Sequence, residues 1–186
     1  MRRLIARVFD YSLDGVIATE ETEFFQFCRD LPDDPEEDAR GREFYAGADL
    51  HIMGRTTYQS MASYFPAATD DPNAEPLNAA HKVVFSRTLK TADWANTTIA
   101  GGDLAEEVGK LRRGGDGYII AHGGIGLWQS LARLDLIDEY RVTLVPYLAG
   151  AGPRLFEDAG QSRQLDLVSS VAFSSGLQLD YRRHRV

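Results

Sequence analysis

The sequence predicts an α/β fold: a central, mostly parallel, twisted sheet flanked by helices, with an antiparallel hairpin at the C-terminal end. Two observations support this fold class. Short apolar runs of strand length alternate with helix-like segments as far as about residue 135, which is the pattern of a sheet built from βα units. Beyond that residue strand-like segments dominate, and the last of them alternate apolar and polar residues as antiparallel strands do.

The first third of the chain supplies the N-terminal elements. An apolar run at 4–9 predicts a buried strand, and Asp14-Gly15 predicts a turn. Aromatic residues within 22–29 indicate a short helix. The acidic segment 32–38 leads into a second helix that ends near Gly47, because acidic residues favour a first turn. A strand at 50–53 and a helix at 56–64 follow.

The segment 66–80 is polar, contains three prolines and predicts a mobile or binding loop. Asp103 with Glu106 resembles a capping box, so a helix is expected directly after it. The other expected elements are strands at 82–85 and 97–100, a strand from 118, a helix marked by Leu127, Leu131 and Leu134, a strand at 140–144, and a hairpin with strands at 165–173 and 177–181.

The composition is that of one globular domain spanning residues 1–186. Hydrophobic residues make up 44% and charged residues 26%, which are ordinary values. The net charge of −8 argues against nucleic-acid binding. No stretch approaches the ~20 apolar residues of a membrane span, and Arg7 and Asp10 interrupt the first apolar run, so no signal peptide is indicated. We expect a cytoplasmic protein whose partner is a small molecule, with no nucleic acid and no membrane involved.

Cysteine and histidine usage indicates no metal centre. Cys28 is the only cysteine, so an internal disulfide is excluded and the thiol is expected to be half-buried and inert. The four histidines are scattered along the sequence, which makes a histidine metal site improbable.

Glycine marks the ends of two predicted strands that lie far apart in the sequence. One is the segment 50–58, with Gly54, and the other is the segment 118–127, with Gly123 and Gly124. Each apolar run stops at glycine and continues into a helix-like pattern. A helix N-terminus directly after a strand offers free backbone N–H groups and a positive dipole end to an anion. Two such corners in one domain suit the two phosphates of a dinucleotide.

No Rossmann, Walker, zinc-ligand or hydrolase-elbow motif is present. The order of several shorter motifs does resemble one family, the dihydrofolate reductase-like reductases. The closer resemblance is to the branch of the RibD C-terminal domain, the reductase domain of the bifunctional riboflavin-biosynthesis deaminase-reductase. The motifs that carry it are SLDGVIA at 12–18, MGRTTY at 53–58, KVVFSRTL at 82–89, HGG at 122–124, LIDE at 136–139, PYLAGAG at 146–152 and LF at 155–156.

The resemblance implies NADPH as cofactor. By themselves the residues after Gly54 indicate only a helix start with a surface arginine. By resemblance, Arg55 contacts the 2′-phosphate together with Ser86 and Arg87, and Arg suits that role because its planar fork of donors is always charged. The remaining residues that the resemblance assigns to the cofactor are Ala18, Gly54, Thr56, Thr57, Gly123, Gly124, Ile125, Gly126 and Leu127.

The glycine pair carries a further expectation. In the family the corresponding pair of glycines is joined by a cis peptide bond, and we expect the same bond between Gly123 and Gly124. A double glycine between a buried strand and an apolar helix is costly in chain entropy, which favours a functional reason for it. His122, directly before the pair, is interpreted as a structural residue at the strand end in preference to a catalyst.

Two carboxylates are candidates for catalysis. Asp14 lies in the segment that the resemblance places over the nicotinamide, and a role as a turn residue fits it equally well. Asp38 falls where folate reductases carry a carboxylate, if one counts back from Gly54 without a gap; it also belongs to an acidic run, and such runs are usually solvated. Hydride transfer to a C=N or C=O bond requires a proton from such a group or from water.

The sequence thus predicts an NADPH-dependent reductase that transfers a hydride to a small heterocyclic substrate. The riboflavin branch implies a phosphorylated aminopyrimidine, as for a 5-amino-6-(5-phosphoribosylamino)uracil reductase, stacked near Phe24, Phe25 or Phe27. The alternatives are a dihydrofolate or pteridine reductase, although the Trp-Pro pair of folate reductases is absent, and a non-catalytic NADPH-binding module. Relatives pair as dimers, so we expect a homodimer formed through Leu177, Leu179 and Tyr181.

Overall fold

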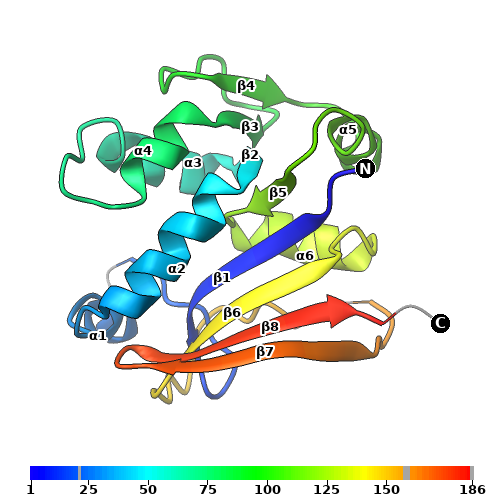
Figure 1. Ribbon diagram of the computed structural model, residues 1–186. Coiled ribbons are helices and arrows are strands. Elements are labelled where there is room, and N and C mark those ends of the chain that lie inside the picture. Colours follow the sequence, from blue (N-terminus) through cyan, green and yellow to red (C-terminus); the bar gives the residue numbers. More distant parts are fainter. Residues whose placement is uncertain (21, 157–159, 185–186) are drawn as a thin grey trace.

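A computed structural model describes residues 1–20, 22–156 and 160–184. Eight strands form one sheet in the order β4-β3-β2-β5-β1-β6-β8-β7 (Figure 1). The strands are β1 (Leu4–Ser12), β2 (Ala48–Gly54), β3 (His81–Phe85), β4 (Thr97–Ala100), β5 (Tyr118–Ala121), β6 (Glu139–Val145), β7 (Leu165–Phe173) and β8 (Gly176–Arg183).

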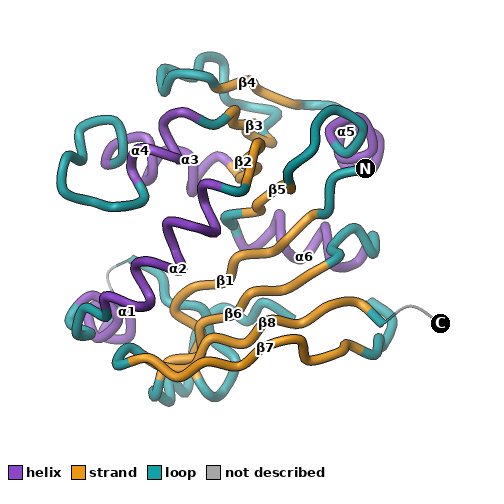
Figure 2. Tube along the Cα trace, in the orientation of Figure 1, coloured by secondary structure: helices purple, strands orange, loops and turns teal. Residues whose placement is uncertain are grey.

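The sheet confirms the predicted fold class. All strand pairs from β4 to β6 are parallel. Strands β6 with β8 and β7 with β8 are antiparallel, so the C-terminal hairpin forms one edge. The helices are α1 (Glu23–Arg29), α2 (Pro35–Ala46), α3 (Arg55–Tyr64), α4 (Ala74–Ala79), α5 (Leu104–Leu111) and α6 (Ile125–Arg133), and they lie on both sides of the strands (Figure 2).

Side chains of β1 alternate between two hydrophobic cores because successive residues of a strand point to opposite faces. Leu4, Ala6 and Val8 belong to the core that includes residues of α5 and α6. Ile5 belongs to the core that includes residues of α2, α3 and α4. A strand buried on both faces reads as a continuous apolar run, which is why the segment 4–9 could be identified from sequence.

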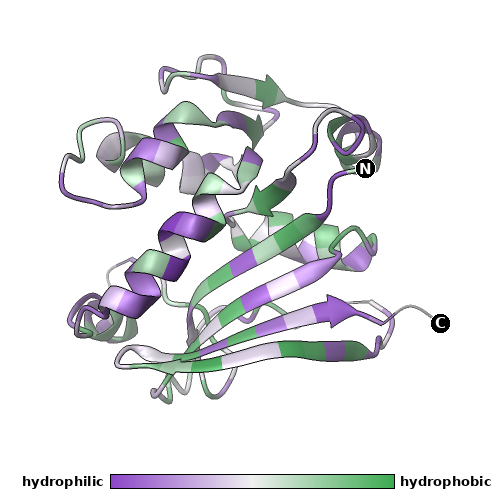
Figure 3. Ribbon diagram, in the orientation of Figure 1, coloured by the Kyte–Doolittle hydropathy of each residue, from purple (hydrophilic) through white to green (hydrophobic). Residues whose placement is uncertain are grey.

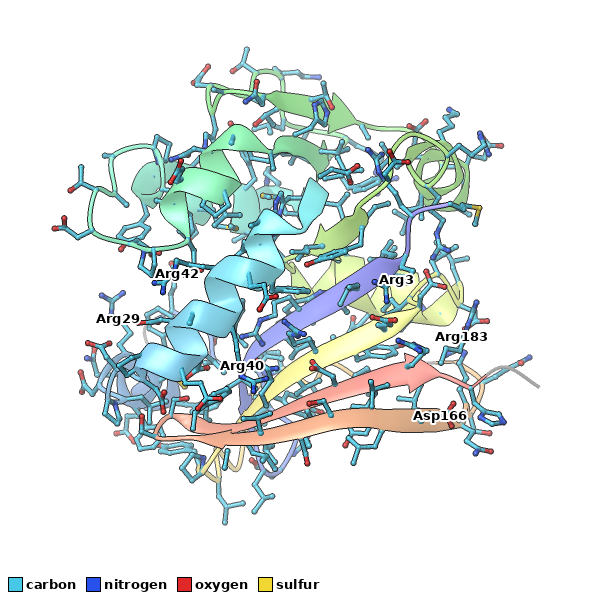
Figure 4. The ribbon with its side chains drawn as sticks, viewed as in Figure 1. Arg3, Arg29, Arg40, Arg42, Asp166 and Arg183 are labelled. Carbon is cyan, nitrogen blue, oxygen red and sulfur yellow. The ribbon has the colours of Figure 1, made fainter. Side chains whose placement is uncertain are left out.

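The hairpin extends the sheet beyond the helices that cover the other strands, as its position at the edge in Figure 1 shows. Among the described strands, β7 has no partner on its outer side, and it carries the exposed apolar side chains of Leu165, Leu167 and Val168, part of the apolar stretch in Figure 3. At the same end of the hairpin, Arg183 pairs in register with Leu165 and forms an ion pair with Asp135 at 2.8 Å; Figure 4 labels Arg183 there.

The segment 66–80 is not the irregular loop that the sequence predicts, because it contains α4. Pro76 is the third residue of that helix, where a backbone N–H would lack an intrahelical partner in any case. Leu77 is fully buried, and the Asn78 side chain accepts a hydrogen bond from Trp94 Nε1 at 2.7 Å. The segment is therefore anchored to the core.

Within the described residues, no helix is long and apolar enough to cross a membrane. The same residues contain no cluster of His, Cys, Asp or Glu side chains suited to a metal ion.

Candidate functional site

A cavity of about 650 Å³ opens at the carboxyl ends of the central parallel strands, the edge where open α/β sheets bind ligands. It collects residues from five parts of the chain, namely β1, the segment after it, α1, α3 and the β5–α6 corner. Its lining consists of Phe9, Asp10, Ile17, Ala18, Thr19, Glu20, Phe25, Thr56, Thr57, Ser60, Met61, His122, Gly123, Gly124, Ile125, Gly126 and Trp128.

The two glycine corners predicted from sequence meet at this cavity. The Gly54 amide donates a hydrogen bond to the Gly123 carbonyl oxygen at 3.0 Å. Helices α3 and α6 begin directly after Gly54 and Gly124, and no side chain among the described residues caps either N-terminus. By contrast, Asp34 and Asp103 cap α2 and α5 with their carboxylates. The uncapped first turns leave backbone N–H groups free for an anion.

The glycine pair reverses the chain through its φ angles. Gly123 has φ 125° and Gly124 has φ 71°, values that L side chains rarely adopt. A Cβ on Gly123 would lie 3.0 Å from the Trp128 ring. The described residues contain no cis peptide bond, so the expected cis bond between the two glycines is wrong. The backbone instead passes this corner through two positive φ angles.

The side chains assigned to the 2′-phosphate gather beside the start of α3. Gly54 pairs in register with Phe85, so Arg55 and Ser86 leave neighbouring strand ends together. Arg55 Nη1 donates to Thr88 Oγ1 at 3.0 Å. Ser86 Oγ accepts from the amides of Thr88 and Leu89 at 3.2 and 2.9 Å. Arg55, Ser86 and Arg87 do not line the cavity itself, and neither do Gly54 and Leu127.

Asp14 lies outside the cavity and fastens one loop to another. Its carboxylate accepts hydrogen bonds from Ser12 Oγ at 2.7 Å and from the amides of Ala149 and Gly150 at 3.0 and 2.8 Å. These bonds, the Ser12 bond foremost, lower the pKa of Asp14 to about 2. Of the two roles predicted for Asp14, this geometry fits the turn residue and not the group that touches substrate. Ala18, which follows in the same segment, does line the cavity.

Asp38 is exposed and borders a different hollow, beside Tyr64 and residues 67–73. The inward-facing carboxylate of α2 is Glu37, which accepts a hydrogen bond from Ser175 Oγ. Neighbouring residues of an α-helix point about 100° apart, so an error of one residue in the ungapped count turns the carboxylate from the inward side of the helix towards solvent. The structure does not bring Asp38 to the cavity.

Of the three phenylalanines predicted to stack on substrate, only Phe25 lines the cavity. Phe24 and Phe27 pack on Tyr147, with ring centroids 4.8 Å apart in both pairs. Their helical spacing already indicated that they could not all face one way.

Sequence reasoning missed Asp10, and it interpreted His122 as a structural residue at the strand end; both residues line the cavity. His122 is buried, and its Nε2 lies 2.6 Å from Nδ1 of His51. Burial lowers the pKa of His122 well below its ordinary value, and the neighbouring His51 and Arg7 lower it further. Asp10 had only one signal in the sequence, namely that it interrupts an apolar strand.

Comparison with known proteins identifies the family. The family model described as the RibD C-terminal domain matches residues 3–179. The chain belongs to this family. It is 33% identical over 141 residues to the uncharacterised protein YyaP of Bacillus subtilis, covering 73% of each chain. It is 26% identical over 185 residues to the uncharacterised protein YwjB of the same organism, covering 98% and 99%.

Solved structures of RibD and dihydrofolate reductase type share the fold. A Shewanella sp. PV-4 protein named for riboflavin biosynthesis matches with TM-score 0.80, 24% identity and coverage of 98% and 99%. Dihydrofolate reductase from Enterococcus faecalis, solved with NADP(H), matches with TM-score 0.64, 16% identity and coverage of 98% and 97%. A pyrimidine reductase-like protein from Corynebacterium diphtheriae matches with TM-score 0.64, 13% identity and coverage of 100% and 93%. The dihydrofolate reductase-like fold is thus confirmed, and membership of the RibD C-terminal family supports a reductase-type role.

Proposed function

We propose that this RibD C-terminal protein is an NADPH-dependent reductase of a small heterocyclic substrate, acting as one domain. One observation carries the proposal. Two helices that start at glycine without a side-chain cap, α3 and α6, meet through the bond from Gly54 to Gly123 at a single cavity. Such paired N-termini suit the pyrophosphate of a dinucleotide.

The residues present fit NADPH in particular. Gly126 has no atom within 4 Å of the position a Cβ would take, which leaves room for a phosphate above the first turn of α6. Arg55, Ser86 and Arg87 supply two cations and a hydroxyl beside α3, as a 2′-phosphate requires. An NADH site would place a carboxylate on the ribose hydroxyls, and no Asp or Glu adjoins Arg55 or Arg87 in sequence. When bound, the nicotinamide supplies the hydride.

The other end of the cavity suits a planar ring with polar edges. Ile17, Phe25 and Met61 offer apolar contact, and Asp10 and His122 offer polar groups. This combination of an apolar wall with a few polar groups is typical of small-molecule sites. An aminopyrimidine of the riboflavin pathway fits this description and agrees with the family. Dihydropteridines, dihydrofolate among them, are the second class to test.

Nucleotide binding and turnover test the proposal separately. Trp128 lines the cavity, so bound NADPH should quench its fluorescence. Titrations followed by this quenching should give a lower Kd for NADPH than for NADH. NADPH oxidation is then followed by nicotinamide absorbance with ribosylaminopyrimidines, dihydropteridines and dihydrofolate as acceptors. Turnover with one class assigns the substrate. Tight binding without turnover across the panel would indicate a nucleotide-binding module, and absence of binding would refute the proposal.

We also propose that the protein forms a homodimer. We move the expected interface from Leu177, Leu179 and Tyr181 to β7, because those three residues are half-buried. Tyr181 packs against the main core, whereas Leu165, Leu167 and Val168 are exposed on the unpaired edge strand. Exposed apolar residues on an edge strand favour association with another chain.

A further inference from the structure

Asp10 combines an unusual backbone conformation with a position in the cavity. From these features and its charged neighbours we propose that Asp10 is the proton donor of the reaction, an inference that rests on the proposed reductase function. Neither carboxylate predicted from sequence can serve, because Asp14 is held by the loop at 149–150 and Asp38 faces another hollow. The described lining contains one other carboxylate, Glu20, which accepts a hydrogen bond from Ser60 Oγ at 3.1 Å and is exposed.

A bulge in β1 directs Asp10 into the cavity. The register between β1 and β6 shifts between Val8 and Tyr11, and Asp10 has φ 52°. A non-glycine residue in this region is uncommon, and bulges often redirect a side chain next to a functional site. The Asp10 carbonyl accepts a hydrogen bond from the Ala18 amide at 3.1 Å. The bulged residue therefore also holds the segment 17–20, which lines the cavity.

A buried cation, Arg7, acts electrostatically on Asp10. Arg7 is 5% exposed, its Nη1 donates to Thr143 Oγ1 at 2.9 Å, and its guanidinium lies 3.5 Å from the centroid of the Phe9 ring. Among the described residues no carboxylate lies within ion-pair distance of Arg7. A buried charge without a carboxylate close by is costly. The Arg7 guanidinium would therefore stabilise a carboxylate that forms at Asp10.

The groups that face Asp10 come from several elements. Arg7 of β1 favours its ionised form, Glu37 of α2 opposes it, and the Cys28 thiol of α1 interacts with the carboxyl. Burial, the largest effect, raises the pKa of Asp10 above its ordinary value. Glu20 and His122 line the same cavity. A carboxyl that holds its proton more firmly than usual and can leave a stabilised anion is suited to general-acid catalysis.

In the proposed step a bound NADPH would supply a hydride and be oxidised, and the carbon of a C=N or C=O bond of the substrate would accept the hydride and be reduced. The π electron pair of that bond passes to the heteroatom, which takes the proton from the Asp10 carboxyl group. The carboxylate that remains is stabilised by Arg7 and recovers a proton from water at the open side of the cavity.

The variant Asp10→Asn tests the proposal, with Asp38→Asn as matched control. Asn is nearly the same size and tolerates positive φ at least as well, so the fold should persist. In Asp10→Asn we expect kcat to fall about a hundredfold while the Kd for NADPH changes less than about twofold. The native kcat should decline as pH rises through the pKa of Asp10, and the variant should lose this dependence. Asp38→Asn should retain both native turnover and the native pH profile.

A binding measurement tests the same residue without turnover. NADP⁺ carries a positive nicotinamide ring and NADPH a neutral one, so ionisation of Asp10 should favour NADP⁺. The ratio of their Kd values, measured over roughly pH 5 to 9, should shift by about tenfold towards NADP⁺ in the native protein and stay constant in Asp10→Asn. Native turnover and pH profile in Asp10→Asn would refute the role of Asp10 and leave the reductase function standing. Failure of the native protein to bind either nucleotide would refute the reductase function, and this proposal with it.

Discussion

Nδ1 of His51, on β2, and Nε2 of His122, directly after the neighbouring parallel strand β5, lie 2.6 Å apart. His51 is fully buried, and His122 stacks on Tyr45 with ring centroids 5.6 Å apart. One ring must donate and the other accept, so a neutral pair satisfies the bond. His122 lines the cavity, and through this pair the wall of the candidate site is continuous with the core.

The histidine pair should make the protein sensitive to acid. Burial lowers the pKa of His51 to about 3 and that of His122 well below its usual range. In the unfolded chain both rings titrate near pH 6.5. Between the low pKa values of the native state and about pH 6.5, the unfolded state binds more protons than the native state, so the free energy of unfolding falls as pH falls. The slope should reach about 1.4 kcal/mol per pH unit for each histidine.

Urea denaturation at a series of pH values measures this slope. His122→Asn should flatten the decline below about pH 6.5, because the variant has one buried ring fewer to protonate. His81 is the matched control, since it is exposed and bonds Thr98 Oγ1 at the surface. His81→Asn should therefore keep the native slope. An equal slope in the native protein and in His122→Asn would contradict the neutral buried pair.

Two glycines of the β5–α6 corner should respond differently to alanine. At Gly123 a Cβ meets the Trp128 ring at 3.0 Å and φ is 125°, so Gly123→Ala should lower the free energy of unfolding by about 1–3 kcal/mol. At Gly126 a Cβ meets nothing within 4 Å, and alanine favours a helix. Gly126→Ala should keep or raise stability.

Nucleotide titrations of the same variants locate the phosphate. The Gly126→Ala methyl would stand at the first turn of α6, so NADPH affinity should fall about tenfold although the protein is no less stable. Unchanged affinity in this stable variant would place the phosphate away from the N-terminus of α6.

The dimer proposal predicts a change of mass. Leu167 is 57% exposed on the edge strand β7, and Leu167→Glu would place a charge there that opposes association. Light scattering should give twice 20.7 kDa for the native chain and 20.7 kDa for the variant. A native mass of 20.7 kDa at micromolar concentration would exclude the dimer, and an undisturbed dimer in Leu167→Glu would place the interface elsewhere.

Features that depend on neighbouring residues in the chain could be predicted from the sequence, whereas contacts between distant segments could not. The strand at 118–121 and the glycine corners follow from apolar runs and from the conformational freedom of glycine, and parallel strands then bring the corners to one edge of the sheet. The contact between His51 and His122 could not be predicted, because it depends on the register between β2 and β5. Asp10 could not be predicted for a related reason: it lies at a shift of register between β1 and β6 and has φ 52°, neither of which the residue pattern reveals.

The carboxylate of α2 that faces the core shows a second limit of prediction from sequence. A count without a gap from Gly54 leads to Asp38, whereas Glu37 is the residue that turns inward. Within a helix a shift of one residue turns the side chain by about 100°, which is enough to move it from the core side to solvent, and no feature of the acidic run fixes that register. It is set by packing and by the Asp34 cap, which only the folded chain displays.

The preference for NADPH over NADH is the last prediction. Arg55 is held beside Ser86 and Arg87 by its hydrogen bond to Thr88, and the two nucleotides differ only in the 2′-phosphate. Loss of one charge-assisted hydrogen bond costs about 1.5–3 kcal/mol, so Arg55→Ala and Arg87→Ala should each weaken NADPH about ten- to a hundredfold and leave NADH nearly unchanged. Arg42→Ala is the control, because Arg42 is exposed on α2, as Figure 4 shows, and should alter neither affinity. The loss should shrink at high salt, since these side chains are open to solvent. Equal losses for both nucleotides would mean that the arginines hold the pyrophosphate or the fold, and tighter binding of NADH to the native protein would overturn the cofactor assignment.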